Sequence, residues 1–200
     1  MTVAGRGCVF LSGAEGWTVG IDPGHSGGLA IVDPGGDLVF VRGWRKIGKR
    51  GYEAFEGVRG DALAPFSVPT LWAAMRTQHG PPGARYHVEK IRLEKRGGSI
   101  PRGIITLAEN AGIAVGFAES RAWAAGERPG ASTWRRDVLG IGGRTKAAAA
   151  EAAAVAAVLG VPRRGSRRVV DLGIGWPPDL ITGHVAEAVC IALWGRGWRV

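Results

Sequence analysis

Three carboxylic acids occupy sequence positions where an unpaired charge would destabilise the folded protein. Asp22 ends an apolar run and begins a Pro-Gly turn. Glu89 lies inside the strand-like segment YHVEKI (86–91), and Glu187 lies in a mostly apolar stretch, three residues after His184. A charge in an apolar element destabilises the fold unless it is paired or bound to a metal. If the fold brings these side chains together, they form a site for cations or for acid–base chemistry.

Carboxylate oxygens are ligands that suit Mg²⁺ or Mn²⁺ rather than zinc. Two such ions roughly 3.5–4 Å apart can activate a water and stabilise the leaving oxygen of a phosphodiester. The formal net charge is +9, and 21 of the 26 basic residues are arginine, which binds phosphate oxygens in pairs. A GC-rich genome would explain the arginine bias but not the net charge. Hydrolysis of a nucleic acid is therefore the predicted chemistry.

Asp22, Glu89 and His184 also have a purely structural interpretation, whereas Glu187 is harder to explain in this way. Asp22 before Pro-Gly is typical of a turn-forming aspartate whose side chain binds its own backbone. Glu89 could lie on a solvated face beside Lys90, and His184 could cap the helix that follows Thr182-Gly183. These alternatives stay open on the sequence alone.

Two motifs of other enzyme classes are excluded by their context. Residues 24–28 spell G-x-S-x-G, but a hydrolase elbow needs a helix after the serine, and here another strand and turn follow. Residues 140–146 contain the glycines of a phosphate-binding loop without its G-K-[ST] order.

The elements that must position the acids begin with an antiparallel meander. Apolar runs separated by tight turns predict strands at Trp17–Ile21, Gly28–Val32 and Asp37–Val41, and Tyr86–Ile91 has strand character. Helical spacing and caps predict five helices, at Thr70–Gln78, Ile100–Gly116, Ser132–Leu139 with Ser132 as its cap, 146–160, and His184–Trp194. Strands followed by alternating helices and strands indicate a mixed α/β domain.

The remaining segments carry weaker signals. Residues 1–16 are predicted to be a flexible leader and 17–200 a single domain; 42–67 are predicted to be an exposed basic loop, and Val115–Ala118 the start of another strand. No apolar stretch approaches the length of a membrane span. Two distant cysteines, Cys8 and Cys190, indicate a reducing intracellular setting.

Four segments together resemble the RuvC-like Holliday-junction resolvases, in particular the shorter phage and prophage versions, within the RNase H-like superfamily. They are GIDPGHSGGLAIVD (20–33), HVEKI (87–91), ASTWRRDVLGIGGRTKAAAAEAAA (131–154) and GHVAEAVCIALWG (183–195). The resemblance implies a central sheet of three antiparallel strands extended by parallel strands and flanked by helices. It also implies a homodimer that cuts two strands of a four-way DNA junction symmetrically.

The resemblance assigns the site residue by residue. Asp22 corresponds to the aspartate of the first strand, Glu89 to the glutamate of the middle strand, and His184 and Glu187 to the paired ligands of the last helix. All four are expected to be catalytic and to bind two Mg²⁺ ions, with Mn²⁺ as a substitute. The sequence departs from the family at the last helix, where Glu187 replaces the common aspartate and His184 stands where many relatives have a carboxylate.

Contacts with DNA are expected from basic residues around the third segment: Arg135, Arg136, Arg144 and Lys146. Lys146 opens an alanine-rich helix, where it could reach a phosphate or remain solvated. Trp134 could stack on DNA, although a place in the core is the simpler interpretation.

The predicted function is that of a metal-dependent endonuclease that resolves branched DNA in the cytoplasm of a bacterial or phage-infected cell. Three alternatives remain. One is another RNase H-like nuclease acting on hybrids, flaps or single strands. The others are an actin-like phosphotransferase, for which 200 residues are short, and a non-catalytic DNA-binding module.

Overall fold

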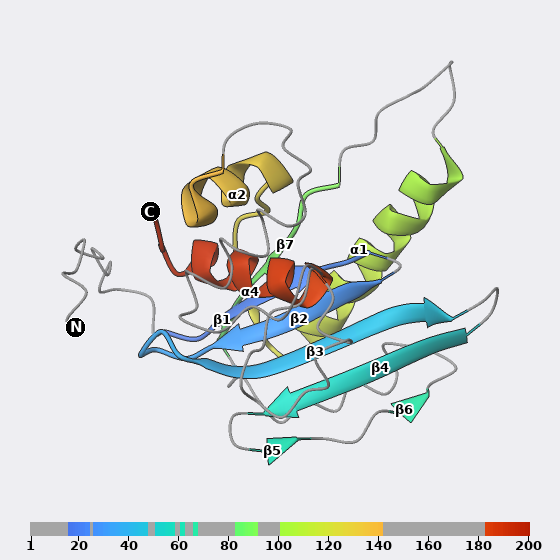
Figure 1. The fold of residues 1–200 in the computed structure, drawn as a ribbon, viewed down its shortest axis with the longest axis horizontal. Helices are drawn as coiled ribbons and strands as arrows, with labels where there is room; N and C mark the ends of the chain where they lie inside the picture. The colour runs from blue at the N-terminus through green and yellow to red at the C-terminus, as the bar shows by residue number, and fades with distance from the viewer. Residues whose placement is uncertain are drawn as a thin grey trace, which may run out of the picture.

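A mixed β-sheet forms the centre of the molecule (Figure 1). The computed structural model describes residues 16–24, 26–47, 51–58, 61–62, 66–67, 83–91, 101–141 and 183–200. Strands β1 (Thr18–Asp22), β2 (Gly27–Val32) and β3 (Leu38–Ile47) form an antiparallel meander. The register pairs Asp22 with Gly28, so β1 and β2 make the predicted hairpin and the hydrolase elbow is excluded.

Parallel strands extend the sheet on the other side of β1. Strand β7 (Arg85–Val88) pairs with β1, and β8 (Ala124–Ala125) pairs with β7, both in parallel. Beyond β3 lie β4 (Gly51–Val58), β5 (Asp61–Ala62) and β6 (Phe66–Ser67), all antiparallel to their neighbours. The order β3-β2-β1-β7-β8 confirms the predicted mixed sheet, in which three antiparallel strands are extended by parallel ones.

Helices cover both faces of this sheet and divide the core into two clusters. Helices α2 (Ala131–Leu139) and α4 (Gly183–Gly195) pack with the side chains of one face, including Ala30, Val32 and Val41. Helix α1 (Arg102–Ser120) packs with the opposite face, including Val19 and Ile21. Successive strand residues point to opposite faces, which is why Leu29 and Ile31 of β2 belong to one cluster and Ala30 and Val32 to the other.

Helix α4 lies unusually close to β1 because β1 has a glycine beneath it. A Cβ at Gly20 would lie 2.0 Å from the Ala188 carbonyl oxygen, so no other residue fits there. The helix is buried along most of its length, and residues such as Ile191 are fully enclosed. Each large side chain buried in this way contributes about 1.5–3 kcal/mol. Close packing on β1 fixes the start of α4 above the end of that strand.

The segment predicted to be an exposed basic loop is instead part of the sheet. Residues 38–47 and 51–58 form β3 and β4, and Arg42 is fully buried. Phe40 and Trp44 pack in the cluster on the α1 face and Val41 packs in the cluster on the opposite face, so the side chains of β3 alternate with the period of a strand buried on both faces. The prediction was wrong because the arginines and glycines of this segment do not show the apolar alternation of a strand. The aliphatic part of an arginine side chain can nevertheless lie in apolar surroundings.

Three further predictions about elements were wrong. Val115–Ala118 belongs to α1, which runs to Ser120 because its small residues pack on the sheet. The strand predicted at Tyr86–Ile91 ends earlier, because β7 stops at Val88, before Glu89. Ser132 lies inside α2, whose N-cap is Gly130. The helices predicted at Thr70–Gln78 and 146–160, and the leader up to residue 15, lie outside the described residues.

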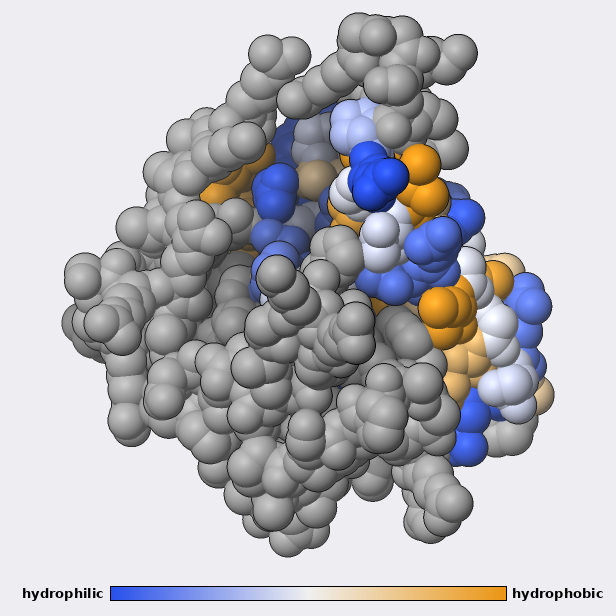
Figure 2. Space-filling view, turned by 90° about the vertical axis from the view of Figure 1, so that its right-hand side faces the viewer, coloured by the Kyte–Doolittle hydropathy of each residue, from blue (hydrophilic) through white to orange (hydrophobic). Residues whose placement is uncertain are grey.

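The described surface is mixed in polarity. On the side toward which α1 projects, hydrophilic and hydrophobic patches lie next to one another (Figure 2). Among the described residues, the exposed large apolar side chains are Ile105 and Ile113 of α1, at 44% and 47%, and Val200, at 62%. Among the described helices, none combines the length and apolar character that crossing a membrane requires.

Candidate metal centre

Asp22 lies at the carboxyl end of β1 and is almost completely buried. Its Oδ1 accepts a hydrogen bond from the Gly24 backbone N–H at 3.2 Å, which is the predicted turn-forming contact. Its Oδ2 lies 2.7 Å from His184 Nδ1. One oxygen therefore shapes the turn while the other faces the start of α4, so the structural and functional interpretations of Asp22 are compatible.

The turn after Asp22 is held from β3 by Trp44. The indole Nε1 of Trp44 donates a buried hydrogen bond to the Gly24 carbonyl oxygen at 3.1 Å. The ring lies against Gly27, where a Cβ would be only 2.3 Å from it. The sequence analysis missed this residue because the strand was predicted to end at Val41; continuing the alternation of β3 would have identified it.

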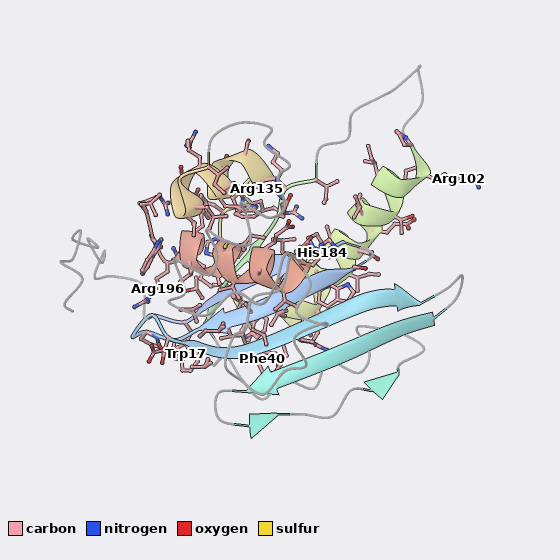
Figure 3. All side chains as sticks on the ribbon, in the orientation of Figure 1. Trp17, Phe40, Arg102, Arg135, His184 and Arg196 are labelled. Carbon is pink, nitrogen blue, oxygen red and sulfur yellow. The ribbon has the colours of Figure 1, made fainter. Side chains whose placement is uncertain are left out.

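Helix α4 carries His184 and Glu187 one turn apart, so that both side chains lie on the face above Asp22. One ligand atom from each of Asp22, His184 and Glu187 lies within 4.8 Å of the other two. Figure 3 shows His184 at one end of α4, with Arg196 beyond the other end. The acids therefore gather at one end of the sheet.

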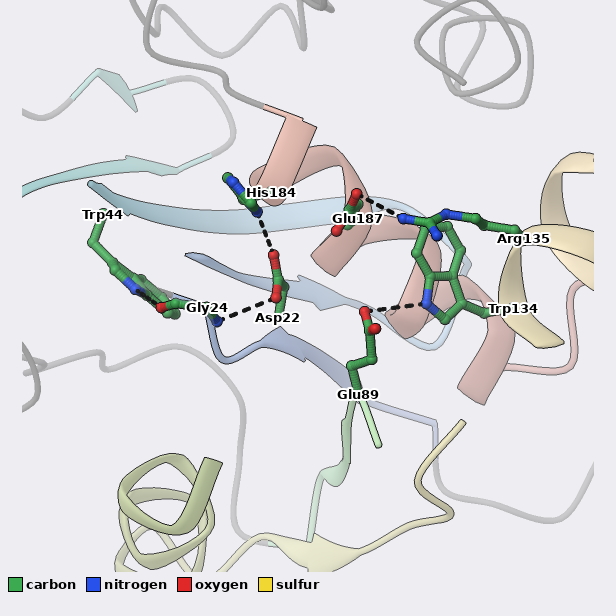
Figure 4. A network of polar contacts seen from close by, with 8 residues as sticks. All are labelled: Asp22, Gly24, Trp44, Glu89, Trp134, Arg135, His184 and Glu187. Atoms are coloured by element: carbon green, nitrogen blue, oxygen red, sulfur yellow. Dashed lines mark hydrogen bonds and ion pairs between the residues drawn. The ribbon is translucent and has the colours of Figure 1, made fainter. Parts of the chain in front are cut away.

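Glu89 follows β7 directly and is tied to β1 through its backbone. Its N–H donates to the Ile21 carbonyl oxygen at 3.1 Å, which places Glu89 beside Asp22 in the sheet. Its Oε2 accepts a hydrogen bond of 3.4 Å from the indole Nε1 of Trp134. Glu89 lies next to the three-residue group rather than inside it, and Figure 4 shows its side chain between Asp22 and Trp134.

One arginine enters the cluster of acids. Arg135 Nη2 lies 3.0 Å from Glu187 Oε1, and the guanidinium stacks over the Trp134 ring at 4.8 Å. Among the described residues, the three carboxylates lie near the guanidinium of Arg135 and the imidazole of His184. Carboxylates gathered in a partly buried site favour the uptake of a cation.

The donor set fits a divalent metal ion. Ligand atoms at 2.0–2.1 Å from one Mg²⁺ are at most about 4.2 Å apart, so a separation of 4.8 Å needs only a small adjustment. Oxygen ligands suit Mg²⁺ and Mn²⁺, and an imidazole nitrogen is a ligand more typical of transition metals. His184 Nδ1 faces Asp22, so a cation held by both residues replaces the proton that they share.

The residues predicted to bind DNA make different contacts in the structure. Arg135 contacts Glu187, whereas Arg136 is two-thirds exposed and pairs with Asp137 at 2.8 Å. Trp134 is fully buried, which confirms its place in the core and removes the stacking alternative. Arg144 and Lys146 lie outside the described residues.

The chain is similar in structure to distant proteins of known structure. No family model and no curated protein matches the chain. Two solved structures of RuvC from Thermus thermophilus, one of them in complex with a Holliday junction substrate, each cover 88% of this chain at 16% identity. The matches cover 90% and 91% of those chains, with TM-scores of 0.40 and 0.39.

Proposed function

We propose that this protein is a Mg²⁺-dependent endonuclease that resolves four-way DNA junctions by paired phosphodiester hydrolysis. The observation that carries the proposal is the convergence of Asp22, His184 and Glu187 within 4.8 Å at the end of the central strand, with Glu89 beside them. Acids at the ends of two neighbouring parallel strands and on a buried helix are costly to assemble without a cation. The four resemblance segments in the sequence give the same assignment.

The proposed roles follow from the positions of the side chains. Asp22, Glu89 and Glu187 would together hold two metal ions, with Asp22 contributing to both. His184 would bind metal or accept a proton from the attacking water. When bound, Mg²⁺ or Mn²⁺ supplies charge stabilisation for the attacking hydroxide and for the departing 3′ oxygen.

The DNA would be held mainly by its phosphates. A net charge of +9 and the exposed Arg136 beside the site favour backbone contacts, to which Arg135, Arg144 and Lys146 would contribute. Two symmetric cuts need two sites, so the active species would be a homodimer acting in the cytoplasm on branched DNA. The exposed apolar side chains of α1, Ile105 and Ile113, are a candidate surface for that association.

A nicking assay on a mobile four-way junction tests the proposal. We expect the wild type to cut the junction with Mg²⁺ or Mn²⁺ in two symmetric positions, and Glu187→Gln to lose this activity while keeping its fold. Cutting of an RNA–DNA hybrid, a flap or a single strand in preference to the junction would indicate a different nuclease of the same fold. Junction binding without cutting under either metal would indicate a DNA-binding module.

A further inference from the structure

We propose that Trp134 is a positioning residue of the metal centre, because its indole N–H holds the Glu89 carboxylate in the orientation that cation binding requires. The inference rests on the proposed function, in which Glu89 is a metal ligand. It assigns to a core tryptophan a role that its size alone does not explain.

The burial of Trp134 makes its hydrogen bond consequential. The side chain is completely enclosed in the cluster formed by α2, α4 and the sheet. A leucine or phenylalanine would supply apolar surface there without a polar atom, whereas a buried indole N–H needs an acceptor. The acceptor is Glu89 Oε2 at 3.4 Å, so the polar edge of the ring points out of the core and into the acidic site.

Glu89 is held at both ends by these contacts. Its backbone N–H donates to the Ile21 carbonyl oxygen, which sets its distance from Asp22, and the indole of Trp134 holds its carboxylate. A glutamate has three side-chain torsions, and fixing them costs conformational entropy each time a cation binds. Because the indole of Trp134 already orients the Glu89 carboxylate in the folded protein, this entropy is lost during folding rather than on metal binding. The apparent affinity for the metal therefore increases.

Helix α2 provides a firm base for this donor. Val138 and Leu139 pack in the same cluster as α4, and the backbone N–H of Val200 bonds to the Asp137 carbonyl oxygen at 3.0 Å. Consecutive residues of this helix contact two acids of the site, Trp134 on Glu89 and Arg135 on Glu187. The orientation of one short helix therefore determines the placement of two proposed ligands.

The experiment compares Trp134→Phe with a matched control, Trp194→Phe. Both tryptophans belong to the same apolar cluster, and both donate an indole N–H to a carboxylate, but Trp194 bonds to Asp137 Oδ2, outside the site. Mn²⁺ binding is measured by calorimetry on the full chain without DNA. We expect Trp134→Phe to bind Mn²⁺ about 10–100-fold more weakly, the usual effect of removing a contact behind a metal ligand. We expect Trp194→Phe to stay within about threefold of the wild type, because α2 keeps its other contacts.

The outcomes separate this inference from the proposed function. If the wild type binds no Mn²⁺, the metal centre and the inference fall together. If the wild type binds Mn²⁺ and Trp134→Phe binds it equally well, the inference alone is overturned. Excess Mn²⁺ should restore junction cutting by Trp134→Phe but not by a variant that lacks a ligand.

A second measurement serves if Trp134→Phe does not fold. The indole N–H resonance of Trp134 is followed by NMR in the wild type and in Glu89→Ala. We expect this resonance to shift when its acceptor is removed, while the resonance of Trp194 stays in place. An unmoved Trp134 resonance would mean that no hydrogen bond joins the two side chains, and would overturn the proposal.

Discussion

The two tryptophan–carboxylate pairs around helix α2 use the same interaction in different electrostatic surroundings. Trp194 Nε1 donates to Asp137 at 3.0 Å, and Trp134 Nε1 donates to Glu89 at 3.4 Å. Both rings are buried in one cluster, and both carboxylates lie near its edge. The difference lies in the charges that surround each acid.

Around Asp137 the chain supplies its own cations. Arg136 Nε lies 2.8 Å from Oδ1, and Arg199 Nε lies 3.7 Å from Oδ2. Burial by itself raises the pKa of Asp137, but the hydrogen bonds from Arg136 and Trp194 outweigh it and hold the pKa below its usual value. A carboxylate balanced in this way is a structural link between α2, α4 and the C-terminal residues.

Around Glu89, the described residues include two further carboxylates, those of Asp22 and Glu187. Arg135 pairs with Glu187, and the imidazole of His184 lies against Asp22. The two pairs share one kind of hydrogen bond and differ in their described neighbours, which are arginines around Asp137 and other acids around Glu89. We expect this difference to separate an acid that serves the fold from acids that serve a ligand.

Asp22→Asn gives the largest expected effect on the acidic side of the comparison. The amide keeps the size of the side chain and its turn contact but loses a ligand charge. Junction cutting should therefore fall by at least about 100-fold, the equivalent of about 2.7 kcal/mol of transition-state stabilisation. Cutting is measured at saturating Mg²⁺, with circular dichroism to verify the fold. Full activity in this variant would make the proposed site untenable.

Asp137→Asn should show the opposite pattern, with a loss of stability and little change in cutting. Hydrogen bonds to charged groups contribute about 1.5–3 kcal/mol, and this change weakens those from Trp194 and Arg136. The free energy of unfolding from urea denaturation is the appropriate measurement. A large loss of activity in a variant that remains folded would erase the distinction between the two acids.

The lowered pKa of Asp137 also predicts how stability depends on pH. As the pH falls below about 4, the unfolded state takes up a proton at this aspartate before the folded state does, so the native state loses stability. The decline should be shallower in Asp137→Asn than in the wild type when unfolding is measured between about pH 5 and pH 2. Parallel curves for the two proteins would show that Asp137 contributes nothing to acid unfolding.

Arg136→Gln should give the smallest effect, on DNA affinity rather than on chemistry. One lost phosphate contact reduces the slope of log affinity against log salt by about one unit. Arg121→Gln is the matched control, because Arg121 follows α1, the helix on the opposite face of the sheet. Equal salt slopes for Arg136→Gln and the wild type would remove Arg136 from the DNA surface.

The parts of the fold that could be predicted are those with strong local patterns. The apolar runs and Pro-Gly turns around Asp22 define β1 and β2, and the long apolar stretch after His184 defines α4. Asp22, His184 and Glu187 do meet, as proposed, because a glycine in β1 allows α4 to pack directly on the sheet.

The rest depended on tertiary contacts that no local pattern contains. Arg42 looks like a surface residue, yet it lies in a buried strand because its neighbours Phe40 and Trp44 face the core. Trp134 was correctly placed in the core, but the direction of its N–H follows from the packing of α2 against α4. Distant partners of this kind become visible only when the elements are assembled.

The central claim is that the acids at the end of β1 form a binding site for divalent cations. A crystal structure of the protein with Mn²⁺, with the metal located by its anomalous scattering, tests this most directly. The account predicts an anomalous peak within about 2.5 Å of Asp22 and Glu187 oxygens, lost in Asp22→Asn. A Mn²⁺-saturated crystal with no peak at these carboxylates, or with an unchanged peak in Asp22→Asn, would contradict it.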